Sequence, residues 1–213
     1  MYEDFQAIKE TLNASERKIE IIENENPRSE AILEWAKIPR SQDLAAVVTY
    51  AEVITVDDWI HVLGHGKGTD GQTIFKLSSL PKDDLMYDSL VIATDVLGGL
   101  FAICTNKTET AYGDVYYLQP ECLEWEPTGF GYSGFLVWLA EDDLDTFYQN
   151  VRWQGWRDMS AHVGVDSAIR FTPDVWFKAC DFGASPRQIV PFKAVLEDIL
   201  STYILDNASN KSI

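Results

Sequence analysis

The sequence has few basic residues, few cysteines and few histidines. Among its 213 residues, lysine and arginine total 17 against 34 aspartates and glutamates, which gives a formal net charge of −17. Because an acidic surface repels phosphate groups, we expect the protein to bind neither nucleic acid nor anionic membranes, and we expect a charged partner to be basic. The three cysteines, Cys104, Cys122 and Cys180, are widely spaced and form no C-x-x-C pair. This pattern predicts reduced, mostly buried thiols in a cytoplasmic protein.

Long hydrophobic runs are also absent. The uncharged stretch that begins at Val96 contains two glycines and ends before Lys107, far short of the roughly 20 residues of a membrane helix. The N-terminal sequence MYEDFQAIKE is charged and lacks the apolar core of a signal peptide. These absences predict a cytoplasmic location and no membrane anchor.

Bulky apolar residues, in contrast, are plentiful. Hydrophobic residues make up 46% of the chain and include 7 tryptophans, 9 tyrosines and 10 phenylalanines, which excludes disorder over most of its length. A chain of this length buries a core as one large domain or as two small ones, and we find no linker or internal repeat that divides it. We therefore expect one domain over residues 1–205 and a flexible, polar tail over residues 206–213.

Apolar spacing predicts helices toward both ends of the chain and strands between them. Helices are expected at residues 2–12, 27–38 and 132–139, from 141 onward, and in the final segment FKAVLEDILSTYIL. Strands are expected at 19–21, 44–64 (two strands with a turn at Asp57 and Asp58), 73–77, 90–93, 100–104, 114–118 and 122–126. Runs such as SLVIATD and GGLFAIC are apolar on both faces, as central strands are, and DVLGG predicts a tight connection between them in which Gly98 or Gly99 has a positive φ. The pattern predicts an α+β protein.

Three glycines, Gly66, Gly68 and Gly71, have the spacing of the dinucleotide-binding motif G-x-G-x-x-G. In that motif the last glycine opens a helix whose N-terminus faces the pyrophosphate. Here the following residues, QTIFKL, alternate as a strand does, and Asp70 with Gly71 is a strong hairpin-turn signal. We therefore interpret this loop as a turn and not as a phosphate site.

A cluster of the form D-D-x-x-H-x-x-x-H comprises Asp57, Asp58, His61 and His65. On a helix the two histidines would share a face and could bind zinc. On the predicted strand they do not, because His65 lies beyond Gly64 in the following loop. The favoured interpretation is surface histidines beside an aspartate turn without a metal, and a metal site at these four residues is kept as a third hypothesis.

The sequence lacks the residues that nucleophilic catalysis needs. The frame G-x-S-x-G around Ser133 fails at its last position, Phe135, and the preceding segment WEPTG does not resemble a strand that leads into a nucleophile elbow. We expect Ser133 to lie in the first turn of a helix. With three histidines and no Cys–His pairing, we predict no catalytic residue and no cofactor.

Acidic and aromatic side chains are concentrated near residue 125. Glu124 and Glu126 flank Trp125, so the two carboxylates are expected on one face of a strand, with Glu121 nearby. Such a pair could act as a glycosidase-like acid–base pair. An acidic and aromatic contact surface is the favoured interpretation, because tryptophan and tyrosine contribute much of the binding energy at interfaces. The candidate binding residues are Asp95, Glu124, Trp125, Glu126 and Tyr132.

Four stretches resemble an uncharacterised bacterial family of unknown function: DDWIHVLGHG, LVIATDVLGGLFAI, YGDVYYLQPECLEWEPTGFGYSGFLVWL and DTFYQNVRWQGW. The resemblance covers about residues 45 to 180. That family in turn resembles the SUKH superfamily of immunity proteins. The shared pattern is an acidic residue followed by two glycines, at Asp95, Gly98 and Gly99, and then strands that carry tyrosines and the pair Trp125–Glu126.

The resemblance implies an α+β fold with a mixed, largely antiparallel sheet packed by helices. Many SUKH proteins are immunity proteins that neutralise toxins, often nucleases, by binding them. We therefore expect a non-enzymatic binding protein of immunity type whose partner is a basic toxin domain. The alternative is a small-molecule-binding or hydrolytic domain with a cleft lined by carboxylates and aromatic side chains, drawn from the five candidate binding residues.

Overall fold

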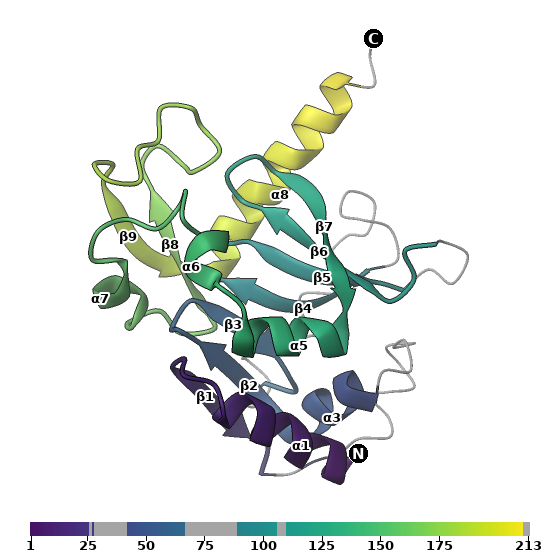
Figure 1. Cartoon of the computed structure of the whole chain (residues 1–213). Coiled ribbons are helices and arrows are strands. Elements are labelled where there is room, and N and C mark those ends of the chain that lie inside the picture. The colour runs from purple at the N-terminus through teal and green to yellow at the C-terminus, as the bar shows by residue number, and fades with distance from the viewer. Residues whose placement is uncertain (26, 28–41, 67–88, 106–109, 211–213) are drawn as a thin grey trace.

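The computed structural model describes residues 1–25, 27, 42–66, 89–105 and 110–210, with side chains described through residue 202 (Figure 1). Seven strands form one antiparallel sheet in which the order in space follows the order in the chain. They are β1 (Ile19–Glu23), β2 (Ala51–Val56), β3 (Ile60–Leu63), β4 (Ser89–Asp95), β5 (Leu100–Cys104), β6 (Asp114–Gln119) and β7 (Glu124–Gly131). A separate antiparallel pair consists of β8 (Ser167–Phe171) and β9 (Arg187–Pro191).

Helices surround the sheet and confirm the predicted α+β class. They are α1 (Tyr2–Asn13), α3 (Gln42–Tyr50), α5 (Tyr132–Glu141), α6 (Leu144–Phe147), α7 (Trp156–Ser160) and α8 (Phe192–Asn210). Helices α1, α3 and α5 pack against one another and against the strands, whereas α8 packs on the β8–β9 pair (Figure 1). No described helix has the length and apolar content needed to cross a lipid bilayer.

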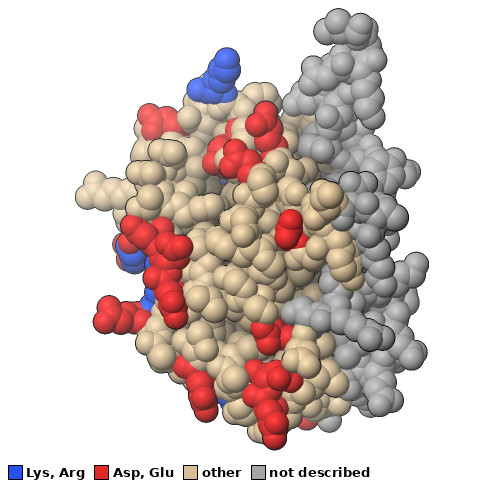
Figure 2. Space-filling model, turned by 45° about the vertical axis from the view of Figure 1, so that its right-hand side comes forward, with Lys and Arg blue, Asp and Glu red and all other residues tan. Residues whose placement is uncertain are grey.

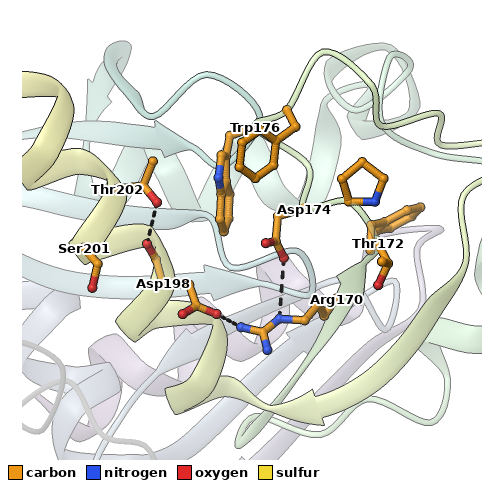
Figure 3. A pocket seen from close by; sticks show the side chains of 10 residues that line it. Arg170, Thr172, Asp174, Trp176, Asp198, Ser201 and Thr202 are labelled. Atoms are coloured by element: carbon orange, nitrogen blue, oxygen red, sulfur yellow. Dashed lines mark hydrogen bonds and ion pairs between the residues drawn. The ribbon is translucent and has the colours of Figure 1, made fainter.

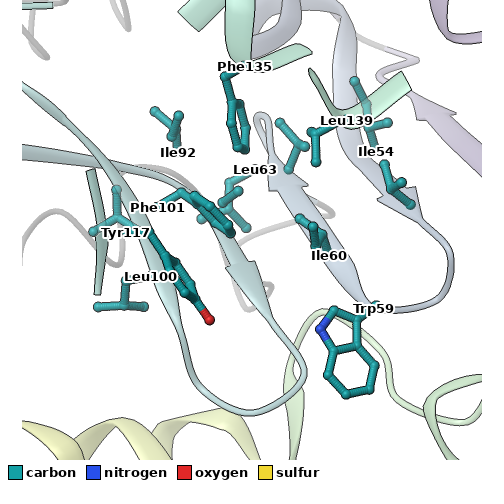
Figure 4. Close-up of a cluster of buried hydrophobic side chains, with 14 of the residues drawn as sticks. Ile54, Trp59, Ile60, Leu63, Ile92, Leu100, Phe101, Tyr117, Phe135 and Leu139 are labelled. Atoms are coloured by element: carbon teal, nitrogen blue, oxygen red, sulfur yellow. The ribbon is translucent and has the colours of Figure 1, made fainter. Parts of the chain in front are cut away.

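The core lies between α5 and the central strands. Strand β5 is buried along its whole length and β4 along all but its first residue, as their apolar sequences predict. Phe101 of β5 packs against Phe135 of α5, with ring centroids 5.0 Å apart, and against Tyr117 of β6 at 4.5 Å (Figure 4). These contacts fix which face of the neighbouring strands β6 and β7 lies toward α5.

Helix α3 is a correction to the sequence analysis, which predicted a strand from residue 44. Valine and threonine favour strands when considered alone. Leu44, Val47 and Val48 are nevertheless buried at helical spacing, and α3 packs against both α1 and α5. Tertiary packing therefore outweighs intrinsic propensity in this segment.

Other elements differ from the prediction in length or were not predicted. The helix expected from residue 141 is only the short α6, capped by Asp143, whose carboxylate accepts from the backbone N–H of Thr146 at 3.0 Å. Helix α7 and strands β8 and β9 were not predicted. Of the cysteines, Cys104 is buried, Cys180 is half-buried and Cys122 is exposed. Residues 28–38 of the expected helix, the strand at 73–77 and the loop from Gly68 to Gly71 lie outside the described residues.

Candidate functional site

Asp95 anchors the turn between β4 and β5 from a fully buried position. Its Oδ1 accepts hydrogen bonds from the backbone N–H groups of Leu97 at 2.8 Å and Gly99 at 2.9 Å. Its Oδ2 accepts from the hydroxyl groups of Tyr117 at 2.5 Å and Tyr148 at 3.3 Å. Both carboxylate oxygens are therefore occupied by groups of the protein itself.

Burial dominates the protonation behaviour of this cluster. Loss of solvent raises the pKa of Asp95 above its ordinary value, and its four hydrogen bonds offset part of that increase. Burial, followed by the neighbouring carboxylate, also raises the pKa values of Tyr117 and Tyr148 well above the ordinary value. Both phenols therefore stay protonated at neutral pH and remain hydrogen-bond donors to Asp95.

Two glycines complete this turn, as the DVLGG pattern predicts. Gly98 has φ +96°, and a Cβ atom there would lie 2.7 Å from Val195 and 2.9 Å from Ile199 of α8. A Cβ atom on Gly99 would lie 2.7 Å from the hydroxyl oxygen of Tyr117. The turn is thus both a hairpin connection and the place where α8 approaches the sheet.

Three glutamates lie at and just after the β6–β7 turn, where β7 is an edge strand of the seven-stranded sheet. Glu124 and Glu126 are exposed and lie on one face of β7, as predicted. The register pairs Glu126 with Tyr117 and Trp125 with Leu118. Because cross-strand partners share a face, the two glutamates lie on the side of Tyr117, and Trp125 lies on the other side.

Around the buried Tyr117, three carboxylates and one exposed aromatic ring form a surface that we call the acidic–aromatic surface. It consists of Glu121, Glu124, Glu126 and Phe147. Phe147 of α6 is 42% exposed, and its ring centroid lies 5.4 Å from that of Tyr117. Sequence reasoning missed Phe147, although an aromatic residue at the end of a short, polar helix is a usable signal.

Glu121 shows that these carboxylates influence one another. Burial raises its pKa above the ordinary value, and the nearby charges of Asp95 and Glu126 raise it further. Its Oε2 atom is buried without a hydrogen-bond partner. Among the described residues, no ion pair involves Glu121, Glu124 or Glu126. The surface therefore carries negative charge that no described basic side chain neutralises.

Tyr132 lies far from these glutamates. It follows β7 directly, and its neighbour Gly131 pairs with Asp114 at the start of β6. Glu124 begins the eight-residue β7, so the two positions are roughly 25 Å apart along the strand. Tyr132 is 3% exposed, and burial, followed by the charge of Asp43, raises its pKa well above the ordinary value. The structure therefore does not gather the five predicted residues into one cleft.

The Asp–His cluster is divided between ion pairs and the core. Asp57 pairs with Arg17 at 2.7 Å, and Asp58 pairs with Lys18 at 2.6 Å. His61 is 3% exposed, so its prediction as a surface residue is wrong: β3 is buried on both faces. Burial lowers the pKa of His61 to about 4. In the part of the chain that the structure describes, no three His, Cys, Asp or Glu side chains are arranged to hold a metal ion.

Ser133 lies in the first turn of α5, where the sequence places it. Its hydroxyl donates a hydrogen bond to the carboxylate of Asp43 on α3. This contact joins the starts of two helices. It does not activate the serine as a nucleophile, since a carboxylate is too weak a base to remove the hydroxyl proton.

The segment RWQGW, part of the family resemblance, has a packing role. The guanidinium of Arg152 lies 4.0 Å from the ring centroid of Trp156, 4.9 Å from that of Trp59 and 5.0 Å from that of Tyr148. Its side chain is 5% exposed and forms an ion pair with Asp145. These cation–π contacts join the segment between α6 and α7 to Trp59, directly before β3, and they support Tyr148, a donor to Asp95.

Comparison with known proteins gives relatives without an assigned activity. Over 158 residues, the chain is 34% identical to the uncharacterized protein YbfG of Escherichia coli strain K12, covering 67% of this chain and 73% of YbfG. It is 28% identical over 162 residues to an uncharacterized protein of Haemophilus influenzae, covering 73% of this chain and 70% of that protein. The model of the family described as "Protein of unknown function DUF2625" matches residues 3–195. The chain therefore belongs to the DUF2625 family.

Proposed function

We propose that this protein is a non-enzymatic, cytoplasmic binding protein whose acidic–aromatic surface binds a basic partner protein. The observation that carries the proposal is the group of three glutamates without described basic partners beside the exposed ring of Phe147. In keeping with the SUKH resemblance, the proposed partner is a toxin domain that is neutralised in the complex. The resemblance is an analogy at the level of the family, so the argument depends on the surface itself.

The distribution of charge supports a basic partner. Apart from Lys178 and Arg187, every lysine and arginine in the described part lies within ion-pair distance of a carboxylate. On the face shown in Figure 2, Asp and Glu side chains are far more frequent than Lys and Arg side chains. A basic protein would be attracted to the acidic–aromatic surface over a distance of about 8 Å at physiological ionic strength.

Phe147 supplies the anchor of this surface because its ring is both exposed and held in place by its neighbours. Its ring packs at 4.8 Å from that of Tyr148 and at 5.0 Å from that of Trp138, measured between centroids. A ring that is already held in place loses little conformational entropy on binding. Interfaces draw much of their energy from a few such aromatic residues, with charges around them setting specificity and association rate.

The test is retention of a partner in the bacterium from which the gene derives. A tagged wild-type chain should retain one basic protein, and Glu124→Lys/Glu126→Lys should lose it. The matched control is Glu10→Lys/Glu16→Lys, which changes the net charge by the same amount. Glu10 lies on α1 and Glu16 lies just after it, and both are exposed. If both double variants lose the protein equally, or neither does, the acidic–aromatic surface is not the binding site.

Glu121 favours the alternative, a small-molecule-binding or hydrolytic domain. A carboxyl group with a raised pKa beside a second carboxylate, Glu126, has the arrangement of an acid–base pair. Turnover of an aryl glycoside by the wild-type chain, abolished by both Glu121→Gln and Glu126→Gln, would support this function. Absence of turnover with partner retention would leave the binding function in place.

A further inference from the structure

A pocket of about 320 Å³ lies between α8 and the chain that leaves β8, apart from the acidic–aromatic surface (Figure 3). Its polar lining comes from Arg170 at β8, Asp174 in the following loop, and Asp198 and Thr202 on α8. Its volume is within the range of small-molecule sites, at the lower end. Nothing in the function proposed above uses these residues.

The charges in this pocket leave a negative excess. Arg170 lies between two carboxylates: its Nε is 3.5 Å from Oδ1 of Asp174, and its Nη2 contacts Oδ2 of Asp198 (Figure 3). The same Nη2 donates to the backbone carbonyl of Ala194 at 3.1 Å. One guanidinium therefore faces two carboxylates, and the remaining oxygen of each carboxylate has no described partner. An anion entering the pocket would meet an arginine that is already neutralised.

Aromatic side chains line the same space. The indole of Trp176 points into the pocket opposite Arg170 (Figure 3), and its neighbour Phe177 is 52% exposed. The two ring centroids are 6.1 Å apart. Carboxylates beside aromatic faces are the combination that recognises organic cations, because the ring quadrupole and the carboxylate both attract positive charge.

We propose that this pocket binds a small organic cation, an ammonium or guanidinium compound. The ligand's charge would lie against the free oxygens of Asp174 and Asp198, and its carbon skeleton against Trp176 and Phe177. The pocket is a hollow of about 320 Å³, a volume that suits a small molecule as the occupant. The proposal does not depend on the binding of a partner protein.

The test uses two probes with the same ring and opposite charge, tyramine and 4-hydroxyphenylacetate, and a second amine, agmatine. In isothermal titration calorimetry with the full chain at constant ionic strength, at least one amine should bind saturably at one site, and 4-hydroxyphenylacetate should not. Asp174→Asn or Asp198→Asn should weaken the amine about threefold to fivefold, and the double variant should abolish its binding. Phe177→Ala should weaken it about twofold to fivefold.

The matched control is Glu197→Gln, a change next to Asp198 in a glutamate that pairs with Lys193 and does not line the pocket. It should leave the affinity unchanged. The asparagine variants keep a carbonyl that accepts from Arg170, and their circular dichroism should match that of the wild type. Binding of 4-hydroxyphenylacetate in preference to tyramine, no saturable binding of either amine at millimolar concentration, or equal weakening by Glu197→Gln would each overturn the proposal.

Discussion

Carboxylates at two turns of the sheet lie in opposite environments. In the β4–β5 turn, Asp95 is buried and accepts four hydrogen bonds from the protein. At the β6–β7 turn, Glu121, Glu124 and Glu126 surround the same tyrosine, Tyr117, and have no described basic partner. A carboxylate whose hydrogen bonds come from its own chain therefore maintains the fold, whereas carboxylates without a basic partner in the described chain are available to a binding partner.

The largest effect should come from removing the satisfied carboxylate. Asp95→Ala leaves two backbone N–H groups and two phenol hydroxyls buried without an acceptor, which should cost about 4 kcal/mol of the free energy of unfolding. Urea denaturation measures this. A loss below about 1 kcal/mol would mean that the hydrogen bonds of Asp95 do not hold the turn.

Gly98→Ala should cost about 2 kcal/mol, because it combines an unfavourable positive φ with a clash against Val195 and Ile199. Gly113→Ala is the matched control: Gly113 has φ +89°, and nothing lies within 4 Å of an added Cβ atom. The control should lose about 1 kcal/mol from backbone strain alone. Equal losses in the two variants would remove the close approach of α8 from the explanation.

His61 should make the fold sensitive to acid. Its folded-state pKa of about 4 lies below the ordinary value of 6.5, so the unfolded chain binds the proton more tightly. The contribution of His61 to stability should therefore fall as pH decreases through the window from about 6.5 to about 4, by about 2 kcal/mol between pH 7 and pH 5.

Comparison with His61→Gln isolates this effect, since the raised pKa of Asp95 acts in both proteins and in the opposite direction. Between pH 7 and pH 5 the wild type should lose about 2 kcal/mol of stability relative to the variant, as followed by urea denaturation at each pH. Identical pH dependence in the two proteins would show that His61 is not the group that titrates.

The smallest effect on stability should come from the unsatisfied carboxylates. Glu124→Lys/Glu126→Lys should change the free energy of unfolding by no more than about 0.5 kcal/mol, because both side chains are exposed and form no ion pair with any described residue. Thermal unfolding of this variant beside the wild type measures the difference. A loss of several kcal/mol would place these glutamates with Asp95, among the residues that maintain the fold.

Much of this contrast could be predicted from the sequence, and its limits have physical causes. The DVLGG turn and the fully apolar β4 and β5 follow from local patterns, and so does the strand that carries Glu124 and Glu126. Alternation along β7 also separates Trp125 from both glutamates. Which face lies toward α5, however, depends on the register with β6, and that is set by long-range packing of Phe101.

Other parts of the site could not be predicted because they depend on contacts between distant segments. Phe147 joins the glutamates only through Tyr117, which is thirty residues earlier in the chain. The helix α3 and the pocket around Arg170 likewise arise where separate elements meet. Local propensity contains no information about tertiary contacts between distant segments.

The central claim is that the unsatisfied glutamates steer a basic partner, and the association rate tests it most directly. Stopped-flow measurements with the recovered partner at two salt concentrations should show association slowing as salt rises. Glu124→Lys/Glu126→Lys should reduce both the rate and its salt dependence, while Glu10→Lys/Glu16→Lys should have a clearly smaller effect. An association rate that is indifferent to salt and to reversal of Glu124 and Glu126 would contradict the account.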